Sequence, residues 1–512
     1  MAGDFPFRLL SDVLDRGSDP VFDSNDGVSS QGVFAANFLG TEPGKSKDIV
    51  AFKTDKDGFL FGNQNLRRVT PRNTPSVINA VFNFRNFFDG RAQNDFNGIN
   101  NWGARDPDAK VYKALSPSQL QPVQISINNA SLASQAVGPP RSDSEMSATG
   151  RTFPDIGHKL LSMKPLALQQ VHSSDSVLGS YSLWPKQGLK IHSYADMIKA
   201  SFQPQWWNSH KKIQGTKCDS ARVVDSQNHH NDDCNHRGNN AYTLMEYNFS
   251  LFFGLAIQMY ESTLVADETP YDRFMMGDAN AVNEAAVRGV DVFRSQARGR
   301  CINCHEGAEL TGASVTRVTA SPIRIREEQA LDRGFNNIGV RLTTDDLGLG
   351  GTDPFGNPLA NIRRAGTTIP TCANGQPCPV VADGFMKVPG LRNVELTAPC
   401  YHNGGLLKLR DVIDFYSRGG DFAKLEQLDG SEIAPLNIFL NSEQEKSDLE
   451  AFLLSLTDER VRYQKAPFDH PQLFIPNGHK LKPGEKGNAK DEFIEIKTVG
   501  RDGGQPLRRF MH

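Results

Sequence analysis

Residues 301–305 read Cys-Ile-Asn-Cys-His, and this stretch says more about the chain than any other. Two cysteines two residues apart, followed at once by a histidine, form the attachment motif of a c-type haem. The thiols form thioethers with the two vinyl groups, and the histidine supplies an imidazole to the iron. A zinc knuckle would need a second ligand pair, and a thioredoxin-type CxxC needs no trailing histidine. The stretch therefore predicts a covalent haem held by Cys301, Cys304 and His305.

Four of the other five cysteines form two close pairs, and Cys400 is left over. Cys372 and Cys378 enclose the loop CANGQPC, which predicts a disulfide-closed turn. Cys218 and Cys234 bracket a polar insert and predict a second disulfide loop. Two disulfides favour an oxidising compartment, so we expect a periplasmic or otherwise exported protein. The first ten residues, MAGDFPFRLL, lack the basic region and the long apolar core of a signal peptide. We therefore expect that such a segment has been removed.

His229 and His230 lie in the same insert, and His236 follows Cys234. Cysteine and histidine are common ligands of transition metals. The spacing matches no zinc pattern, so an exposed disulfide loop is the favoured interpretation.

Length and charge narrow the class of protein. A chain of 512 residues is long enough for two or more domains. Lys and Arg number 56 and Asp and Glu 59, a net charge of −3 that offers no basic footprint for nucleic acid. No apolar run reaches the roughly 18 residues of a membrane helix. Apolar periodicity predicts helices at 74–84, 157–171, 194–202, 239–264, 280–295 and 442–456.

Blocks on both sides of the haem motif carry a family resemblance. They are PRNTPSVINAVFN (71–83), FFDGRA (87–92), LASQAVGP (132–139), SEM (144–146), FNNIGV (335–340), FMKVPGLRNVELTAPCYHNGG (385–405), RDVIDFYSRGG (410–420) and AFLLSLTDE (451–459). In this order, from about residue 20 to residue 460, the chain resembles the bacterial dihaem cytochrome c peroxidase family, which includes MauG.

The resemblance implies a mainly α fold of two cytochrome-c-like helical domains with long irregular loops. We expect an N-terminal peroxidase-like domain over 1–275 and a C-terminal cytochrome c domain over 276–460. Residues 461–512 are rich in Pro and Lys, and we expect a tail that wraps onto the body or stays mobile. In the family each domain normally carries one haem. The C-terminal haem takes electrons from a small redox protein, and the N-terminal haem reduces hydrogen peroxide.

The sequence departs from the family at the N-terminal haem. The attachment motif would stand where this chain has FAANF (34–38), so both thiols and the imidazole are missing. No Cys precedes Cys218, and no His precedes His158. The family's relay tryptophan between the haems corresponds to Phe88. We therefore expect one haem, in the C-terminal domain; the alternative is an unattached second haem reached by a distant histidine.

The resemblance also suggests a ligand opposite His305. In family peroxidases a methionine fourteen residues after the histidine of the HxGG block caps the electron-transfer haem. Counting from His402 leads to Tyr416, and MauG is similar in having a tyrosine there. A phenolate favours ferric iron, whereas a thioether raises the potential. The alternatives are that Tyr416 is a core aromatic and that Met386 supplies a thioether. His402 is expected near a haem propionate.

Two residues match the family's peroxide chemistry. Glu145 corresponds to the glutamate that moves protons during peroxide cleavage, and Gln135 is carried over with it. A catalytic acid must lie within hydrogen-bond reach of the bound oxygen. Because no haem is expected beside these two residues, a structural role is favoured over catalysis.

The resemblance further implies a calcium ion at the domain interface. Its ligands would be Asn73 and the backbone carbonyls of Thr397 and Pro399. Oxygen ligands of this kind suit calcium.

Together these inferences predict a c-type haem oxidoreductase of the peroxidase/MauG type, with one covalent haem ligated by His305 and Tyr416. It would exchange electrons with a small redox protein and act on hydrogen peroxide, provided that Tyr416 can leave the iron. The alternative is a non-catalytic electron-transfer cytochrome, which loss of the peroxide-reducing haem favours. In a third interpretation the haem only stabilises the fold.

Overall fold

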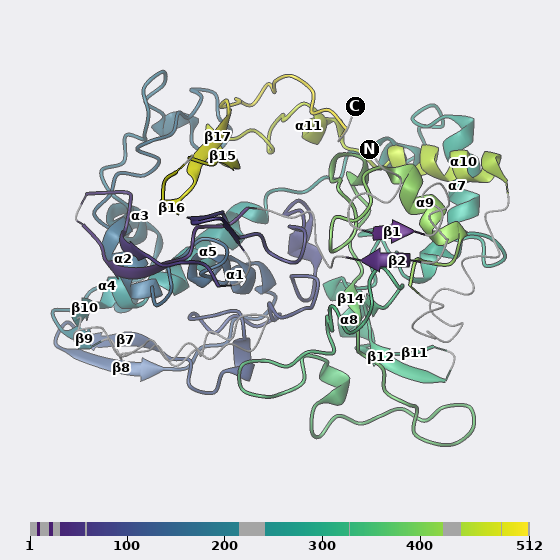
Figure 1. The fold of residues 1–512 in the computed structure, drawn as a ribbon, viewed down its shortest axis with the longest axis horizontal. Coiled ribbons are helices and arrows are strands. Elements are labelled where there is room, and N and C mark those ends of the chain that lie inside the picture. The colour runs from purple at the N-terminus through teal and green to yellow at the C-terminus, as the bar shows by residue number, and fades with distance from the viewer. Residues whose placement is uncertain are drawn as a thin grey trace.

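The computed structural model describes residues 8–10, 20–23 and 31–509, apart from 43, 57, 58, 215–240, 327, 423–441 and 483. Two lobes lie side by side in it (Figure 1). The helices of the first lobe are α1 (Ser131–Ala136), α2 (Phe153–Leu160), α3 (Tyr194–Ser201), α4 (Leu244–Tyr247) and α5 (Phe249–Glu261). Those that follow in the chain are α6 (Pro270–Met275), α7 (Glu284–Arg294), α8 (Val315–Ala320), α9 (Leu409–Ser417), α10 (Glu443–Leu454) and α11 (Glu459–Arg462).

The expected mainly α class is wrong. The structure is 26% helical and 19% strand, and its strands form many small sheets. The antiparallel pairs are β1 (Arg8–Leu10) with β2 (Pro20–Asp23), β3 (Ala36–Gly40) with β4 (Ile49–Phe52), β5 (Leu60–Phe61) with β6 (Gln64–Asn65), β7 (Val111–Ser116) with β8 (Gln119–Val123), β9 (Lys212–Gln214) with β10 (Ala241–Thr243), β11 (Ile323–Arg326) with β12 (Gln329–Asp332), β13 (Phe335–Asn336) with β14 (Met386–Lys387), and β15 (Leu473–Lys480) with β17 (Lys490–Ile496). The 45 Gly and 29 Pro keep helices short, and long segments between the family blocks fold as hairpins instead.

Each lobe has its own apolar core. In the first lobe α5 packs on α1 and α2, and Phe96, Phe249 and Phe252 are buried there. In the second lobe α7 packs on α10, and the rings of Phe293 and Phe452 lie 5.0 Å apart. These two helices confirm the helices predicted at 280–295 and 442–456.

The helix predicted at 74–84 is wrong, because only a 3₁₀ turn forms there, at Ala80–Phe82. Asn79 before it has a φ of 61°, a left-handed conformation that Asn tolerates better than most residues. Its side chain exchanges two hydrogen bonds with the backbone of Ala266, of 3.1 and 2.7 Å. These tertiary bonds replace the helical ones.

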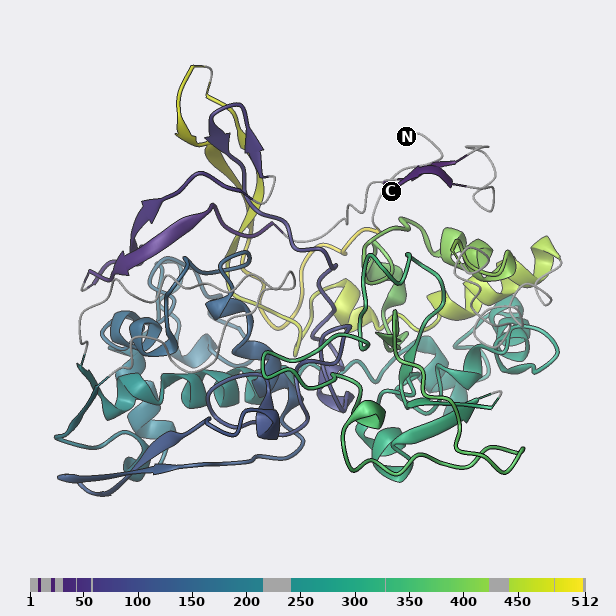
Figure 2. The ribbon, with the colours of Figure 1, turned by 60° about the horizontal axis from the view of Figure 1, so that its bottom comes forward.

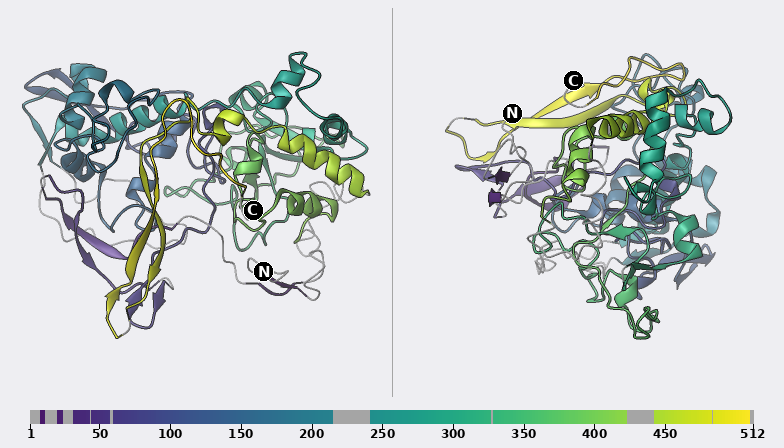
Figure 3. Two further views of the ribbon diagram at one scale, coloured as in Figure 1. Left: turned by 90° about the horizontal axis from the view of Figure 1, so that it is seen from above. Right: turned by 90° about the vertical axis from the view of Figure 1, so that its right-hand side faces the viewer.

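The chain after α11 returns to the first lobe. The β15–β17 hairpin stands beside the strands of residues 36–65 (Figures 2 and 3), and β16 (Gly487–Asn488) pairs in parallel with β6. Arg67 holds Asp491 of this tail through an ion pair of 2.7 Å. The domain boundaries at 275 and 460 stay predictions.

Cys372 and Cys378 form the predicted disulfide. The predicted Cys218–Cys234 pair, with the three histidines between and after it, lies outside the described residues. Within the described ranges, none of the helices has both the length and the apolar composition needed to cross a membrane.

Candidate functional site: the cavity behind residues 301–305

The end of α7 places the CxxCH motif. The helix ends at Arg294, and the chain then turns back through Gly299, where a Cβ would lie only 2.5 Å from the carbonyl oxygen of Val292. Arg300 follows in the left-handed region with a φ of 53°, and a 3₁₀ turn forms at Cys301–Asn303. Because Gly299 permits this close approach, both cysteines reach the wall of a cavity.

The cavity has a volume of about 420 Å³ and gathers most of the predicted site residues. Those on its wall are Cys301, Cys304, His305, Met386, His402, Tyr416, Asn73, Thr397, Pro399 and the relay position Phe88. They come from the segments 73–88, 301–305, 386–402 and from α9, so the fold unites stretches more than 300 residues apart. Apolar residues of α9 and α10 complete the wall, among them Val412, Ile413 and Leu453.

The His305 ring is oriented by two carbonyl groups. Its Nδ1 lies 3.1 Å from the carbonyl oxygens of both Leu310 and Pro389. Carbonyls only accept, so Nδ1 must carry the proton, and Nε2 keeps its lone pair. Burial lowers the pKa of His305 to about 4, against the opposing effect of the two carbonyls. The side chain is therefore a neutral imidazole with Nε2 available to a metal.

Tyr416 lies on α9 and borders the same cavity. Burial, with a smaller effect of the Cys304 and Cys301 thiols, raises the pKa of the Tyr416 phenol. The phenol thus stays protonated unless a strongly positive group such as a ferric ion stabilises the phenolate. The ring of Tyr401 packs against it edge-on, with 6.5 Å between centroids.

Met386 borders the cavity too, from β14. Its thioether sulfur lies only 3.0 Å from where a Cβ on Gly348 would stand, so the sulfur packs on that glycine. Because Met386 lies on the cavity wall, it stays the alternative to Tyr416 as the second ligand.

His402 is 7% exposed, and its Nε2 has no hydrogen-bond partner among the described residues. Burial lowers the pKa of His402 to about 4, with smaller effects of Asp346, Arg72 and Arg341. The ring of Phe88 lies 6.2 Å from it, edge-on. An unsatisfied buried ring nitrogen on a cavity wall fits a polar group of a bound cofactor.

Asn73 and Pro399 are in direct contact. The Asn73 Nδ2 donates a hydrogen bond of 2.7 Å to the carbonyl oxygen of Pro399, and its backbone N–H donates to that of His402. Thr397 borders the same space. No group of three or more His, Cys, Asp or Glu side chains suited to a metal occurs among the described residues. The calcium ligands would be neutral oxygens, with the Asn73 amide turned to present Oδ1.

Lys387 is a further residue of the site, and no sequence motif indicated it. It borders the cavity beside Met386, is 5% exposed, and burial lowers its pKa to about 8. The available signal was a single lysine within the apolar run FMKVP (385–389).

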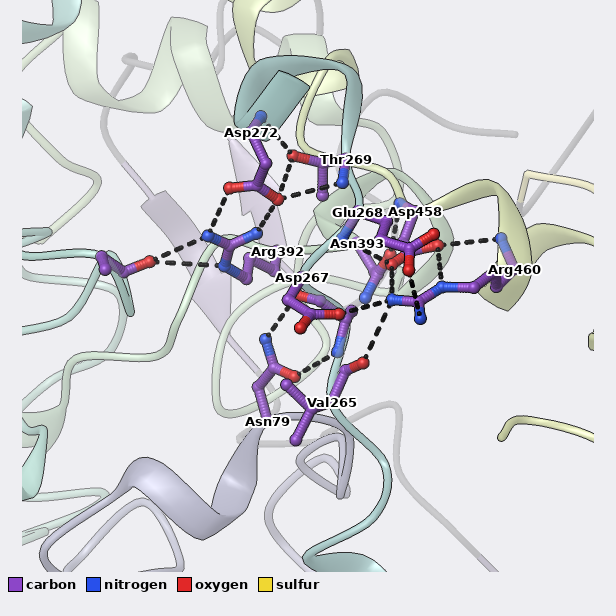
Figure 4. A network of polar contacts seen from close by, with 12 residues as sticks. Asn79, Val265, Asp267, Glu268, Thr269, Asp272, Arg392, Asn393, Asp458 and Arg460 are labelled. Atoms are coloured by element: carbon purple, nitrogen blue, oxygen red, sulfur yellow. Dashed lines mark hydrogen bonds and ion pairs between the residues drawn. The ribbon is translucent and has the colours of Figure 1, made fainter. Parts of the chain in front are cut away.

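One wall of the cavity is fixed by a polar network (Figure 4). Arg392 on that wall bonds both carboxylate oxygens of Asp272 and the carbonyl oxygen of Ala308. The next residue, Asn393, accepts a hydrogen bond of 2.9 Å from the backbone N–H of Asp458. Bidentate Arg–carboxylate pairs fix geometry well, so this segment is a rigid support.

Comparison with known proteins adds to this geometry. Residues 49–280 match the family model described as di-haem cytochrome c peroxidase. The chain is 31% identical over 202 residues to cytochrome-c peroxidase IdrP2 of Denitromonas iodatirespirans. The matched stretch covers 39% of this chain and 47% of that protein. It is 29% identical over 218 residues to the methylamine utilization protein MauG of Methylorubrum extorquens, covering 43% and 46%. Over these stretches, each of which makes up less than half of the chain, the sequence is similar to the dihaem cytochrome c peroxidase/MauG family.

The similarity to individual family members is partial. The chain spans about half the length of the curated relatives it matches. The crystal structure of the diheme peroxidase BthA from Burkholderia thailandensis aligns over 91% of this chain and 99% of its own, at 16% identity and a TM-score of 0.39.

Most of the segment FAANF (34–38), where the N-terminal haem motif was expected, belongs to a strand. Residues 34–38 run into β3, and Ala36 and Phe38 are buried with Ala148. The approach is so close that a Cβ on Gly32 would lie 1.6 Å from the carbonyl oxygen of Ser144. This segment is therefore packed against the backbone of residues 144–149, where Val33 and Phe38 donate to the carbonyl oxygens of Ser144 and Thr149.

Glu145 and Gln135 do not line the cavity with the other site residues. Gln135 lies on α1 in the first lobe. Burial raises the pKa of Glu145, opposed by Arg91 and assisted by Asp89. The structure thus keeps these two residues apart from the CxxCH cavity.

Proposed function

We propose that this chain is a c-type haem oxidoreductase of the cytochrome c peroxidase/MauG type, with a single haem attached through Cys301 and Cys304. The observation that carries the proposal is that Cys301, Cys304, His305 and Tyr416 all line the same cavity of about 420 Å³. A bound haem would supply one-electron redox chemistry at its iron.

The chain's own residues fit that group. His305 offers a neutral imidazole whose Nδ1 proton is held by carbonyl groups, which fixes the ring for iron ligation. Tyr416 offers a half-buried phenol on the same cavity, and His402 offers an unsatisfied Nε2. We assign Tyr416 as the second axial ligand, with Met386 as the alternative.

The N-terminal segment supports a count of one haem. Residues 34–38 contain no thiol or imidazole, and from Ala36 onward they belong to strand β3. Glu145 and Gln135 therefore keep a structural role in this proposal. Calcium bound by Asn73, Thr397 and Pro399 is part of it as well.

The proposed reaction is one-electron exchange with a small redox protein, coupled to reduction of hydrogen peroxide when Tyr416 leaves the iron. An exported location fits the Cys372–Cys378 disulfide. A second candidate is a non-catalytic electron-transfer cytochrome, and the lack of Cys and His in residues 34–38 favours it. Peroxide turnover with a reduced cytochrome as donor supports the first; a reversible redox wave without turnover supports the second.

The attachment is tested by counting haem. We expect a pyridine haemochrome assay and intact mass to give one covalent haem per chain. The double variant Cys301→Ala/Cys304→Ala should carry none. Cys400→Ala is the matched control, because this third thiol also borders the cavity but lies outside the motif. Two haems per chain, or a thioether-bound haem in the double variant, would overturn the proposal.

A further inference from the structure

Lys387 stands out among the charged groups of the cavity. It belongs to β14, which pairs with β13, so that Lys387 lies opposite Phe335. Its backbone N–H donates a hydrogen bond of 2.7 Å to the carbonyl oxygen of Phe88. Backbone pairing on both sides thus fixes where the side chain starts, and the side chain is 5% exposed and borders the cavity.

The Lys387 ammonium has no hydrogen bond or ion pair with any residue that the structure describes. A buried ammonium without a counter-charge is strongly destabilising, so proteins pair such groups. The carboxylate of Asp346 borders the same cavity, but both its oxygens are bonded to Arg72, at 2.6 and 2.7 Å. Glu309 accepts a hydrogen bond from Thr316 instead. The protein therefore leaves this positive charge for a group in the cavity.

Other cations on the wall are bonded to protein acceptors. Arg72 pairs with Asp89 and Asp346, Arg392 pairs with Asp272, and Arg324 donates to the carbonyl oxygen of Asn303. Lys387 differs from them in this respect. A long, unbranched ammonium side chain also adapts easily to a single acceptor.

We propose that Lys387 binds a propionate carboxylate of the haem held in this cavity, with His402 Nε2 as a second polar contact. This inference rests on the proposed attachment of haem at Cys301 and Cys304. Phe88 links the two groups, since its carbonyl holds the Lys387 backbone and its ring packs on His402. A carboxylate on a covalently attached haem has a high effective concentration at Lys387, which a free anion lacks.

The first test uses the haem-loaded full chain. We compare Lys387→Met, Lys387→Gln and Lys387→Arg with Lys110→Met, which removes an exposed lysine outside the cavity. Resonance Raman propionate bending modes and the reduction potential are measured. We expect Lys387→Met and Lys387→Gln to shift the propionate modes and lower the potential, because loss of a positive charge favours ferric iron. Lys387→Arg should retain both properties, and Lys110→Met should leave both unchanged.

A second test removes the haem. In the Cys301→Ala/Cys304→Ala background, Lys387→Met should lower the unfolding equilibrium constant by about tenfold, because an unpaired buried charge is replaced by an apolar chain. In the haem-loaded protein the same substitution should raise that constant. A merely structural lysine would change stability in the same direction in both.

The outcomes separate the two proposals. If the unmodified chain carries no covalent haem, the proposed haem attachment is overturned, regardless of the results for the Lys387 variants. Loaded Lys387→Met and Lys387→Gln with unchanged propionate modes and potential overturn the Lys387 assignment alone. Added acetate could instead change the reduction potential of the unmodified protein but not that of Lys387→Met. If the propionate modes are also the same in both proteins, Lys387 is assigned to a free carboxylate.

Discussion

The guanidinium of Arg85 lies 2.8 Å from the carboxylate of Asp332, and both side chains are 4% exposed. The two residues come from opposite lobes and are 247 positions apart. Asp332 also accepts hydrogen bonds from the backbone N–H groups of Asn361 and Ile362. The pair is thus buried away from water, and backbone N–H groups of the second lobe hold the Asp332 carboxylate in place.

Two further arginines of the first part of the chain pair with carboxylates of the second lobe, one in a buried pair and one in a half-buried pair. Arg72 bonds Asp346 and Arg105 bonds Asp353. Three charge pairs therefore join the two lobes, and the two buried ones, Arg85–Asp332 and Arg105–Asp353, tolerate loss of one partner poorly.

The first prediction concerns the Arg85–Asp332 pair. Arg85→Met should lower the free energy of unfolding by about 3–5 kcal/mol, because Asp332 stays buried without its counter-charge. Arg85→Met/Asp332→Asn should recover part of that loss. Urea unfolding of the haem-loaded chain provides the measurement.

Arg410→Met is the matched control, since Arg410 pairs with the exposed Glu443. It should cost no more than about 1 kcal/mol. Equal effects of the two single substitutions would contradict the role given to the buried pair.

The second prediction concerns Tyr416. Tyr416→Phe removes the phenol oxygen and keeps the ring, so stability should fall by less than about 1.5 kcal/mol. The ferric spectrum should change from six-coordinate His/Tyr, and peroxide reactivity should rise because a position on the iron opens. Tyr416→Met should raise the reduction potential, since a thioether favours ferrous iron more than a phenolate does.

Tyr181→Phe is the control, because Tyr181 is an exposed tyrosine outside the cavity. It should leave the ferric spectrum unchanged. An unchanged spectrum in Tyr416→Phe would remove Tyr416 as ligand and leave Met386 or an open site.

The third prediction tests the calcium site. A chelator should lower the melting temperature of the protein, and added calcium should restore it. Calcium at about 100 times its Kd would stabilise the fold by ~2.7 kcal/mol. Asn73→Ala should abolish this response. If Asn73 serves only through its 2.7 Å hydrogen bond to Pro399, the variant loses about 1 kcal/mol and the chelator changes neither protein.

The fourth prediction concerns pH. Burial raises the pKa of Glu261 from 4.5 to about 7. The folded protein therefore binds a proton that the unfolded chain has released, and stability falls as pH rises from about 4.5 to about 7. Glu261→Gln should remove about one proton from the pH dependence of unfolding across this window. Glu284→Gln, at an exposed position, is the control; the same slope in all three proteins would argue against a protonated Glu261.

Local chemistry made some features readable from the sequence. Residues 301–305 are adjacent in the chain, so their haem-binding character needs no knowledge of the fold. Cys372 and Cys378 are six residues apart and could be paired by spacing. The helices α7 and α10 follow from their apolar periodicity, because each packs one face on the other.

Tertiary structure decided the rest. Residues 74–84 have a helical pattern, but Asn79 bonds the backbone of Ala266, 187 positions away, and the segment turns instead. The fold is mixed α and β rather than mainly α because the tail and long segments between the quoted sequence blocks form β-hairpins. The strands of these hairpins lie mostly outside those blocks. Lys387 acquired its significance only when β13, β14 and Phe88 enclosed it beside the cavity. Sequence determines interactions between near neighbours, whereas burial and pairing of distant groups depend on contacts that exist only once the chain has folded.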